Sequence, residues 1–322
     1  MTARSETGGA PLVVLGEIRT GLLMNRSPLP APADARLLEL VPGERVRVYE
    51  RPVRRVVSAD LPYGVDCPLF TESGRRVRGI GTLLTRACVV GGRIVQGSTR
   101  AVVVAGGDRR LPWAHYLARP GVVETGGRGA PENLRSRFLA GRDDDGLDPG
   151  AVSASLVGRV QRSPLLDHRA AFPARPTRLR WAAAVGGEGF HGAFALADDE
   201  TRTLRLTLGP TAGATPERLA TLCEDLALHD WLLTTVALVV ERACADGDSA
   251  GLRALRPVVD GLVHLWMPGA GVAPGLLKVW EHLEERPGLT RQWNACVHRL
   301  RDHMALRALE SITARREDSP PG

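Results

Sequence analysis

The chain has 322 residues, of which 43% are hydrophobic and 24% charged, values typical of a globular protein of one large or two ordinary domains. No apolar run approaches the length of a membrane span, and the LVVL run near the amino terminus is too short for a signal peptide. The five cysteines are scattered, odd in number and free of metal-ligand spacing, a pattern of reduced compartments. We therefore expect a cytoplasmic protein.

The formal net charge of +6 is carried unevenly along the chain. The net charge is +6 over residues 1–150, +3 over residues 151–214 and −3 over residues 215–322. All 42 basic residues except Lys278 are arginine, a bias that points to GC-rich coding and so is not read as a phosphate-binding signal. A basic amino-terminal part and a mildly acidic carboxy-terminal part can steer a charged partner electrostatically. Solvated charges on two ordinary surfaces explain the same pattern.

Residues 1–10 are small and polar and are expected to be disordered, and residues 11–212 are expected to form a β-rich region. Apolar alternation predicts strands at 12–18, 45–50, 53–59, 178–185, 193–197 and 203–208, with a short helix at 33–40. Two further apolar runs flank Gly91 and Gly92, a pair that predicts a two-residue hairpin. Together these segments predict an antiparallel sheet of four to six strands.

The stretch from 126 to 150 is polar and rich in glycine, and it is expected to be a mobile loop carrying a short helix at 132–139. A second helix is expected at 151–160.

Residues 213–313 predict a four-helix bundle, so the fold class expected for the whole chain is α+β. The first helix begins at Thr215, and apolar stripes predict the others at 256–266, 275–285 and 290–312. Four tryptophans are available to close a core belonging to this block alone: Trp231, Trp266, Trp280 and Trp293. The tail, 314–322, is expected to be disordered.

Several nucleotide and metal motifs are missing. The single lysine lies within a predicted helix, which excludes a P-loop. The GGEGFHG stretch places Gly187, Gly189 and Gly192 in a dinucleotide-like pattern, but the chain continues as a strand where that motif needs a helix, so a hairpin connection is favoured. The eight histidines show no metal-ligand spacing. We therefore expect no cofactor and no metal.

One candidate catalytic set remains. Cys67 follows Asp66 in GVDCPL, and His115 in LPWAHY can complete a Cys-His site. The competing interpretation is a buried structural cysteine, together with a loop around Trp113, His115 and Tyr116 that is anchored at the sheet edge by flanking prolines.

Arginine clusters offer a third interpretation, nucleic-acid binding. They lie at Arg54–Arg55, Arg75–Arg78 and Arg109–Arg110, without interleaved aromatic residues or a known nucleic-acid-binding signature. We therefore rank nucleic acid below a protein as the expected partner.

Six stretches, VVLGEIRTGLL, GVDCPLFTESG, RRLPWAHYLARPGVVE, LALHDWLLTTV, VDGLVHLWMPGA and ERPGLTRQW, together resemble an uncharacterised protein family of GC-rich Gram-positive bacteria. The resemblance spans nearly the whole chain and implies a bacterial protein encoded beside a variant P-loop protein and a methyltransferase-like protein. It brings no activity or site residue. The leading interpretation is a non-catalytic adaptor of a multi-protein system that binds protein partners, a P-loop NTPase among them. An enzyme using Asp66, Cys67 and His115 is the alternative.

Overall fold

The structure is a computed structural model that describes residues 12–107, 109–126, 131–141, 146–186, 189–209, 213–246 and 249–317. The expected disorder of residues 1–10 lies outside the described residues, as do parts of the expected loop at 126–150. The expected disordered tail is described as far as residue 317, and there it is helical.

Within the described residues the fold is α+β, with one mixed sheet of ten strands and eight α-helices. The strands are β1 (Leu12–Leu22), β2 (Arg47–Tyr49), β3 (Arg55–Val57), β4 (Leu61–Phe70), β5 (Arg76–Val90), β6 (Ile94–Ala105), β7 (Val122–Thr125), β8 (Thr177–Val185), β9 (His191–Leu196) and β10 (Thr201–Leu208). The helices are α1 (Ala31–Leu37), α2 (Trp113–Leu117), α3 (Arg135–Ala140), α4 (Pro149–Gln161), α5 (Pro216–Asp246), α6 (Ser249–Leu262), α7 (Leu277–Glu285) and α8 (Leu289–Glu317).

The sheet is mixed, which corrects the expectation of a purely antiparallel one. The strand order is β2-β3-β5-β7-β6-β1-β8-β10-β9, with β4 paired to β5 and an additional β5–β6 pairing. Most neighbours are antiparallel, but β7 runs parallel to β6 and β10 runs parallel to β8. A parallel pair needs a crossover connection. The chain makes one through α2 between β6 and β7, and another through β9 between β8 and β10.

The connection after β8 therefore differs from the predicted hairpin. Strands β8 and β9 do not pair, because β10 lies between them and forms its own antiparallel hairpin with β9. Of the glycine pattern, Gly187 lies outside the described residues, Gly189 has a φ of 71° and Gly192 lies in β9.

The hairpin between β5 and β6 is confirmed, with a longer turn than predicted. Val90 pairs with Ile94, so three residues form the turn. Gly91 and Gly92 have φ values of 58° and 65°, which a side chain disfavours. The glycine pair thus gave the position of the turn correctly and its length wrongly.

Strand β4 was not predicted. Its sequence contains Pro62 and Pro68, and proline removes a backbone donor from a strand. The strand pairs only with β5 and lies off the main path of the sheet, an edge position that proline tolerates.

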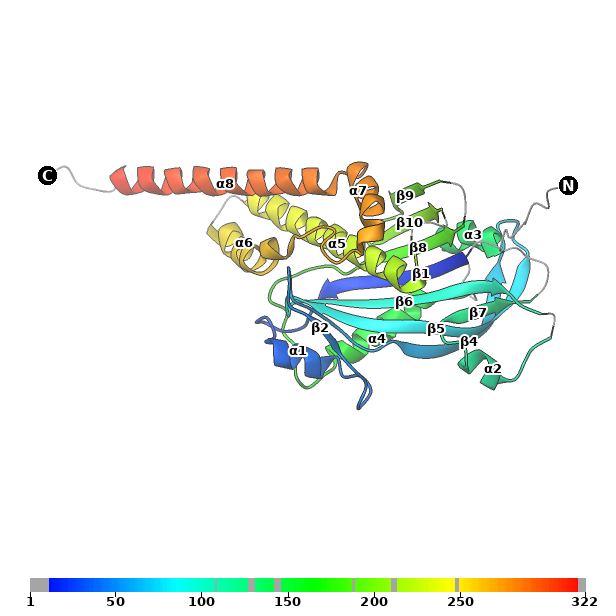
Figure 1. The fold of residues 1–322 in the computed structure, drawn as a ribbon. Helices are drawn as coiled ribbons and strands as arrows, with labels where there is room; N and C mark the ends of the chain where they lie inside the picture. The colour runs from blue at the N-terminus through cyan, green and yellow to red at the C-terminus, as the bar shows by residue number, and fades with distance from the viewer. Residues whose placement is uncertain are drawn as a thin grey trace.

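The two faces of the sheet are covered by different helices (Figure 1). Gln96 and Gly97, consecutive in β6, show the alternation: the Gln96 amide donates to the Glu224 carbonyl of α5, whereas a Cβ on Gly97 would lie 2.6 Å from the Ser153 carbonyl of α4. Helices α1 and α4 thus pack on one face, and α5 crosses the other against β1, β6 and β8.

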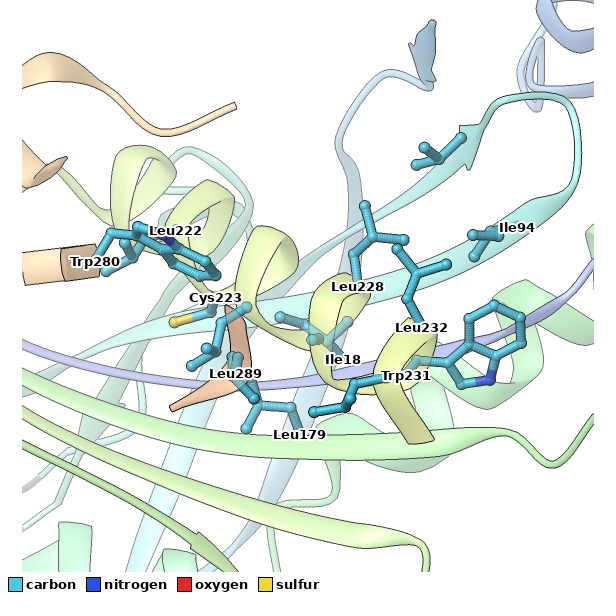
Figure 2. Close-up of a cluster of buried hydrophobic side chains, with 14 of the residues drawn as sticks. Ile18, Ile94, Leu179, Leu222, Cys223, Leu228, Trp231, Leu232, Trp280 and Leu289 are labelled. Carbon is cyan, nitrogen blue, oxygen red and sulfur yellow. The ribbon is translucent and has the colours of Figure 1, made fainter. Parts of the chain in front are cut away.

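Helix α5 is central, as its sequence predicted. Figure 2 shows its buried side chains between the strands and the neighbouring helices. Trp231 is fully buried, and its indole N–H donates to the Arg175 carbonyl at 2.8 Å. Leu222 and Leu232 are fully buried in the same cluster as Ile18 and Leu179 of the sheet.

The predicted four-helix bundle is not confirmed. Helices α5, α6, α7 and α8 are present close to the predicted positions, but they do not close a core of their own, because the core of α5 is shared with the sheet. Helix α8 packs through Leu289, Trp293 and Leu300 and then extends away from the body of the molecule (Figure 1). Met304 beyond that point is 51% exposed.

Candidate functional site

A pocket of about 510 Å³ lies where the β2–β3 hairpin meets α5. Its walls come from four places: the hairpin, β5, the first four turns of α5, and the segment 265–273 that follows α6. Five arginines line it: Arg47, Arg51, Arg55, Arg86 and Arg218. This volume is typical of a site for a small organic ligand.

The floor of the pocket is a buried ion cluster centred on Glu224 of α5. Arg86 of β5 donates to both Glu224 carboxylate oxygens, from Nε and Nη2, each at 2.8 Å. Arg55 of β3 donates to the same carboxylate through Nη2 and to the Cys88 sulfur through Nε at 3.1 Å. The Glu224 side chain has no exposed surface. This cluster fixes α5 to the strands and holds both arginines rigidly at the pocket.

The cluster keeps Glu224 ionised. Burial alone would raise the pKa of its carboxyl, but the charges of Arg86 and Arg55 and their hydrogen bonds outweigh burial and lower the pKa to about 2. Burial raises the pKa of the neighbouring Cys88 thiol, against the opposing effect of Arg55. The floor therefore contains fixed charges and a protonated thiol.

A second carboxylate, Glu217, lies at the pocket wall on the first turn of α5. Its Oε1 accepts from Arg47 Nη1 at 2.8 Å, and Arg86 Nη1 lies 3.7 Å from the same oxygen, beyond hydrogen-bond distance. The side chains of Arg47 and Glu217 are 38% and 52% exposed, so this pair is in contact with solvent, where an ion pair contributes little stability. Arg218 follows Glu217 and donates to the Gly213 carbonyl at 3.1 Å.

The segment 265–273 is held against α5 by two hydrogen bonds that its backbone N–H groups donate to side chains of the helix. The Met267 N–H donates to His229 Nε2 at 3.2 Å, and the Gly269 N–H donates to Asp225 Oδ2 at 2.9 Å. A Cβ on Gly271 would lie 3.1 Å from Arg55 Nη1, so the backbone passes close to this arginine.

His229 is held neutral in this position. Because Nε2 accepts from Met267, the ring proton is assigned to Nδ1, which donates to the Asp225 carbonyl at 2.7 Å. Burial lowers the pKa of His229, although Asp225 opposes this shift. Both ring nitrogens are therefore engaged.

The charge of the pocket is positive overall. Its lining holds five arginines against the carboxylates of Glu217 and Asp225, and Glu224 beneath adds a third. With His229 neutral, positive charges exceed negative charges by two. This excess of positive charge favours an anionic ligand.

The structure places the predicted catalytic residues elsewhere, at the opposite end of β5 from the hairpin. Asp66 of β4 pairs with Arg78 at 2.8 Å and with Arg110 at 3.3 Å. His115 of α2 pairs with Glu124 of β7 at 2.7 Å. Burial, with Asp66 adding to it, raises the pKa of the Cys67 thiol to about 11. A thiol with so high a pKa is not activated as a nucleophile.

The segment around Trp113 is a short helix, where a loop was expected. Tyr116 is buried, and its hydroxyl accepts from the Leu111 N–H at 3.0 Å. The Trp113 ring packs edge-on against Tyr116 at 5.7 Å, and a Cβ on Gly64 of β4 would lie 3.5 Å from it. These contacts are of the anchoring kind that the flanking prolines predicted.

The arginine clusters singled out in the sequence divide between structural and exposed positions. Arg54 pairs with the buried carboxylate of Asp34, and Arg55 belongs to the pocket floor. Arg76 and Arg109 are exposed.

Within the residues that the structure describes, no helix has the length and apolar character needed to cross a bilayer, and no cluster of three or more His, Cys, Asp or Glu side chains is arranged to hold a metal. Comparisons with protein-family models, curated proteins and solved structures found no match to the chain.

Sequence reasoning missed the pocket. Arg86 lies in an apolar strand run, and its partner Glu224 is 138 residues further along the chain. One signal was present: Glu224, Asp225 and His229 lie among the apolar residues of the helix predicted to be central, and buried ionisable groups need partners.

Proposed function

We propose that the protein is a non-catalytic adaptor of a multi-protein system, and that the arginine-lined pocket is its recognition site for an anionic group. The observation that carries this proposal is the convergence of five arginines from separate elements on one pocket with excess positive charge. Arginine is the residue best suited to carboxylate and phosphate recognition, because its planar guanidinium presents paired donors.

The polar groups of the pocket favour binding over catalysis. A site for covalent catalysis needs a nucleophile beside an available base. Here the Glu224 carboxylate is saturated by two arginines, and His229 uses both nitrogens in structural hydrogen bonds. The Thr221 hydroxyl accepts from Arg86 and donates to the Glu217 carbonyl. Each group has a structural role that a reaction would have to break.

The partner side of the proposal rests on charge and on the family resemblance. Residues 1–214 are basic and residues 215–322 are acidic, so the chain offers complementary surfaces to a charged protein. The resemblance implies a neighbouring variant P-loop protein, which is the first partner to test. The chain lacks a glycine-loop lysine, so in such a system the P-loop would be supplied by this partner.

The test is direct reconstitution. The full chain is mixed with the neighbouring P-loop protein at tens of micromolar, with and without ATP, and the mixture is analysed by sedimentation velocity. A stoichiometric complex supports the adaptor. If no complex forms under any nucleotide condition, and none forms with the methyltransferase-like neighbour, the adaptor proposal is wrong.

A further inference from the structure

We infer that the pocket binds a small amphipathic anion, an apolar body bearing a carboxylate or phosphate, whose head group replaces the Glu217 carboxylate between Arg47 and Arg86. This inference rests on the proposed recognition role of the pocket and names the chemical class of what it recognises.

The head-group position is marked by the chain's own carboxylate. Glu217 Oε1 lies 2.8 Å from Arg47 Nη1 and 3.7 Å from Arg86 Nη1. Arg86 spends Nε and Nη2 on Glu224, so its Nη1 is the donor left facing Glu217. Glu217 is attached to α5 and does not reach Arg86 at hydrogen-bond distance, whereas the carboxylate or phosphate of a free ligand can lie between the two arginines and contact both.

Displacing Glu217 is inexpensive. Its side chain is half exposed, and exposed ion pairs contribute little to stability. Once displaced, the carboxylate can point into solvent from the first turn of α5. Arg86 cannot move in the same way, because its side chain is 3% exposed and tied to Glu224. The anion position is therefore built from one fixed arginine and one adjustable arginine.

Part of the remaining lining is an apolar surface that offers no partner to a polar ligand body. It consists of six side chains: Val53, Val57, Val90, Leu228, Leu265 and Val272. A polar ligand body would lose hydrogen bonds to water here without replacement, whereas an alkyl or aromatic body gains from burial. The volume of about 510 Å³ accommodates a small molecule more readily than a folded segment.

The experiment measures binding by calorimetry at low ionic strength with six probes: octanoate, butyrate, octyl phosphate, inorganic phosphate, the uncharged 1-octanol and a short acidic peptide. Each buried methylene contributes about fourfold in affinity, so octanoate is expected to bind up to about 200-fold more tightly than butyrate. Octyl phosphate is expected to bind at least as well as octanoate. Inorganic phosphate and octanol, each lacking one half of the ligand, are expected to bind far more weakly.

Three variants locate the site. Arg47→Ala is expected to weaken octanoate binding at least tenfold, and Glu217→Gln, which removes the internal competitor, is expected to tighten it severalfold. Arg45→Ala is the matched control, since Arg45 is exposed, lies two residues before Arg47 and does not line the pocket. Melting curves of all three confirm that the variants remain folded, as expected for exposed positions.

Four outcomes overturn the inference: no saturable binding of octanoate or octyl phosphate, affinity independent of chain length, equal effects of Arg47→Ala and Arg45→Ala, or binding of an acidic peptide in preference to both amphiphiles. The last outcome would identify a partner segment as the occupant. The sedimentation test of complex formation is also run without ATP, and it uses none of these probes. If the amphiphiles do not bind but the protein complex forms, only this inference is refuted. If the amphiphiles bind but no protein complex forms, only the adaptor proposal is refuted.

Discussion

Glu224→Gln is the substitution that most directly tests the buried ion cluster. The amide keeps the size of the side chain but removes the charge, and it turns one acceptor into a donor that faces Arg86 or Arg55. Both guanidinium groups then remain inside the protein without their counter-charge. We expect the variant to be strongly destabilised and to remain foldable.

Removing one partner of a buried ion pair costs about 3–5 kcal/mol. The pKa of Glu224 is lowered from 4.5 to about 2 on folding, which corresponds to about 3 kcal/mol at neutral pH. A loss of this size is a large share of the 5–15 kcal/mol by which a typical domain is stable.

The pH dependence follows from the sign of the shift. Glu224 has a lower pKa in the folded state, so its contribution is fully present above pH 4.5 and is lost as the pH falls toward 2. The difference in unfolding free energy between wild type and Glu224→Gln should thus be about 3 kcal/mol at pH 7 and about 1 kcal/mol at pH 3.

Urea denaturation at pH 7, 5, 4 and 3 measures this difference. The matched control is Glu241→Gln, on an exposed position of the same helix, where a change within about 0.5 kcal/mol is expected. If Glu224→Gln costs no more than the control, or if its cost does not change between pH 7 and pH 3, the buried charge cluster is not what holds α5 to the sheet.

Three further predictions concern other parts of the core. Gly16→Ala should destabilise the protein by about 1–3 kcal/mol or more, because the added Cβ would lie 2.5 Å from the Trp181 ring. Gly107→Ala is the control, since nothing lies within 4 Å of a Cβ at that position and no destabilisation is expected. Thermal melting compares the two variants. Trp231→Phe should cost about 1–3 kcal/mol in urea denaturation, because it shortens a fully buried side chain and removes the donor to the Arg175 carbonyl. Because burial lowers the pKa of His229 in the folded state, wild type should lose stability as the pH falls below 6.5. His229→Gln should remove this part of the pH dependence. If the unfolding free energy of the variant follows the same pH profile as that of wild type, the prediction is wrong.

The parts of the fold that were predictable are those set by local sequence. Apolar alternation located β1 and β8, and the glycine pair located the β5–β6 turn. Helix periodicity located α5 and α8. In each case the residues that determine the element lie within it, so spacing alone carries the information.

The missed features depend on pairing over long sequence separation. Strand β10 pairs in parallel with β8, and no local residue specifies that it should insert between β8 and β9. Strand β4 was missed because its prolines argue against a strand unless its edge position is known. The shared core of α5 was missed for the same reason, since an apolar helix face does not indicate whether its partner is a helix or a sheet.

The arginines of the pocket are held in place by the buried core. Arg86 and Arg55 present their free edges to the pocket only because Glu224 fixes their other donors, and Glu224 is fixed because α5 is buried against the sheet. The pocket is therefore preformed, and a ligand need not order the arginines on arrival. The adjustable part is the Arg47–Glu217 pair, which is in contact with solvent. Selectivity among anions should accordingly reside in this exposed pair, while the buried cluster sets the sign of the charge that is accepted.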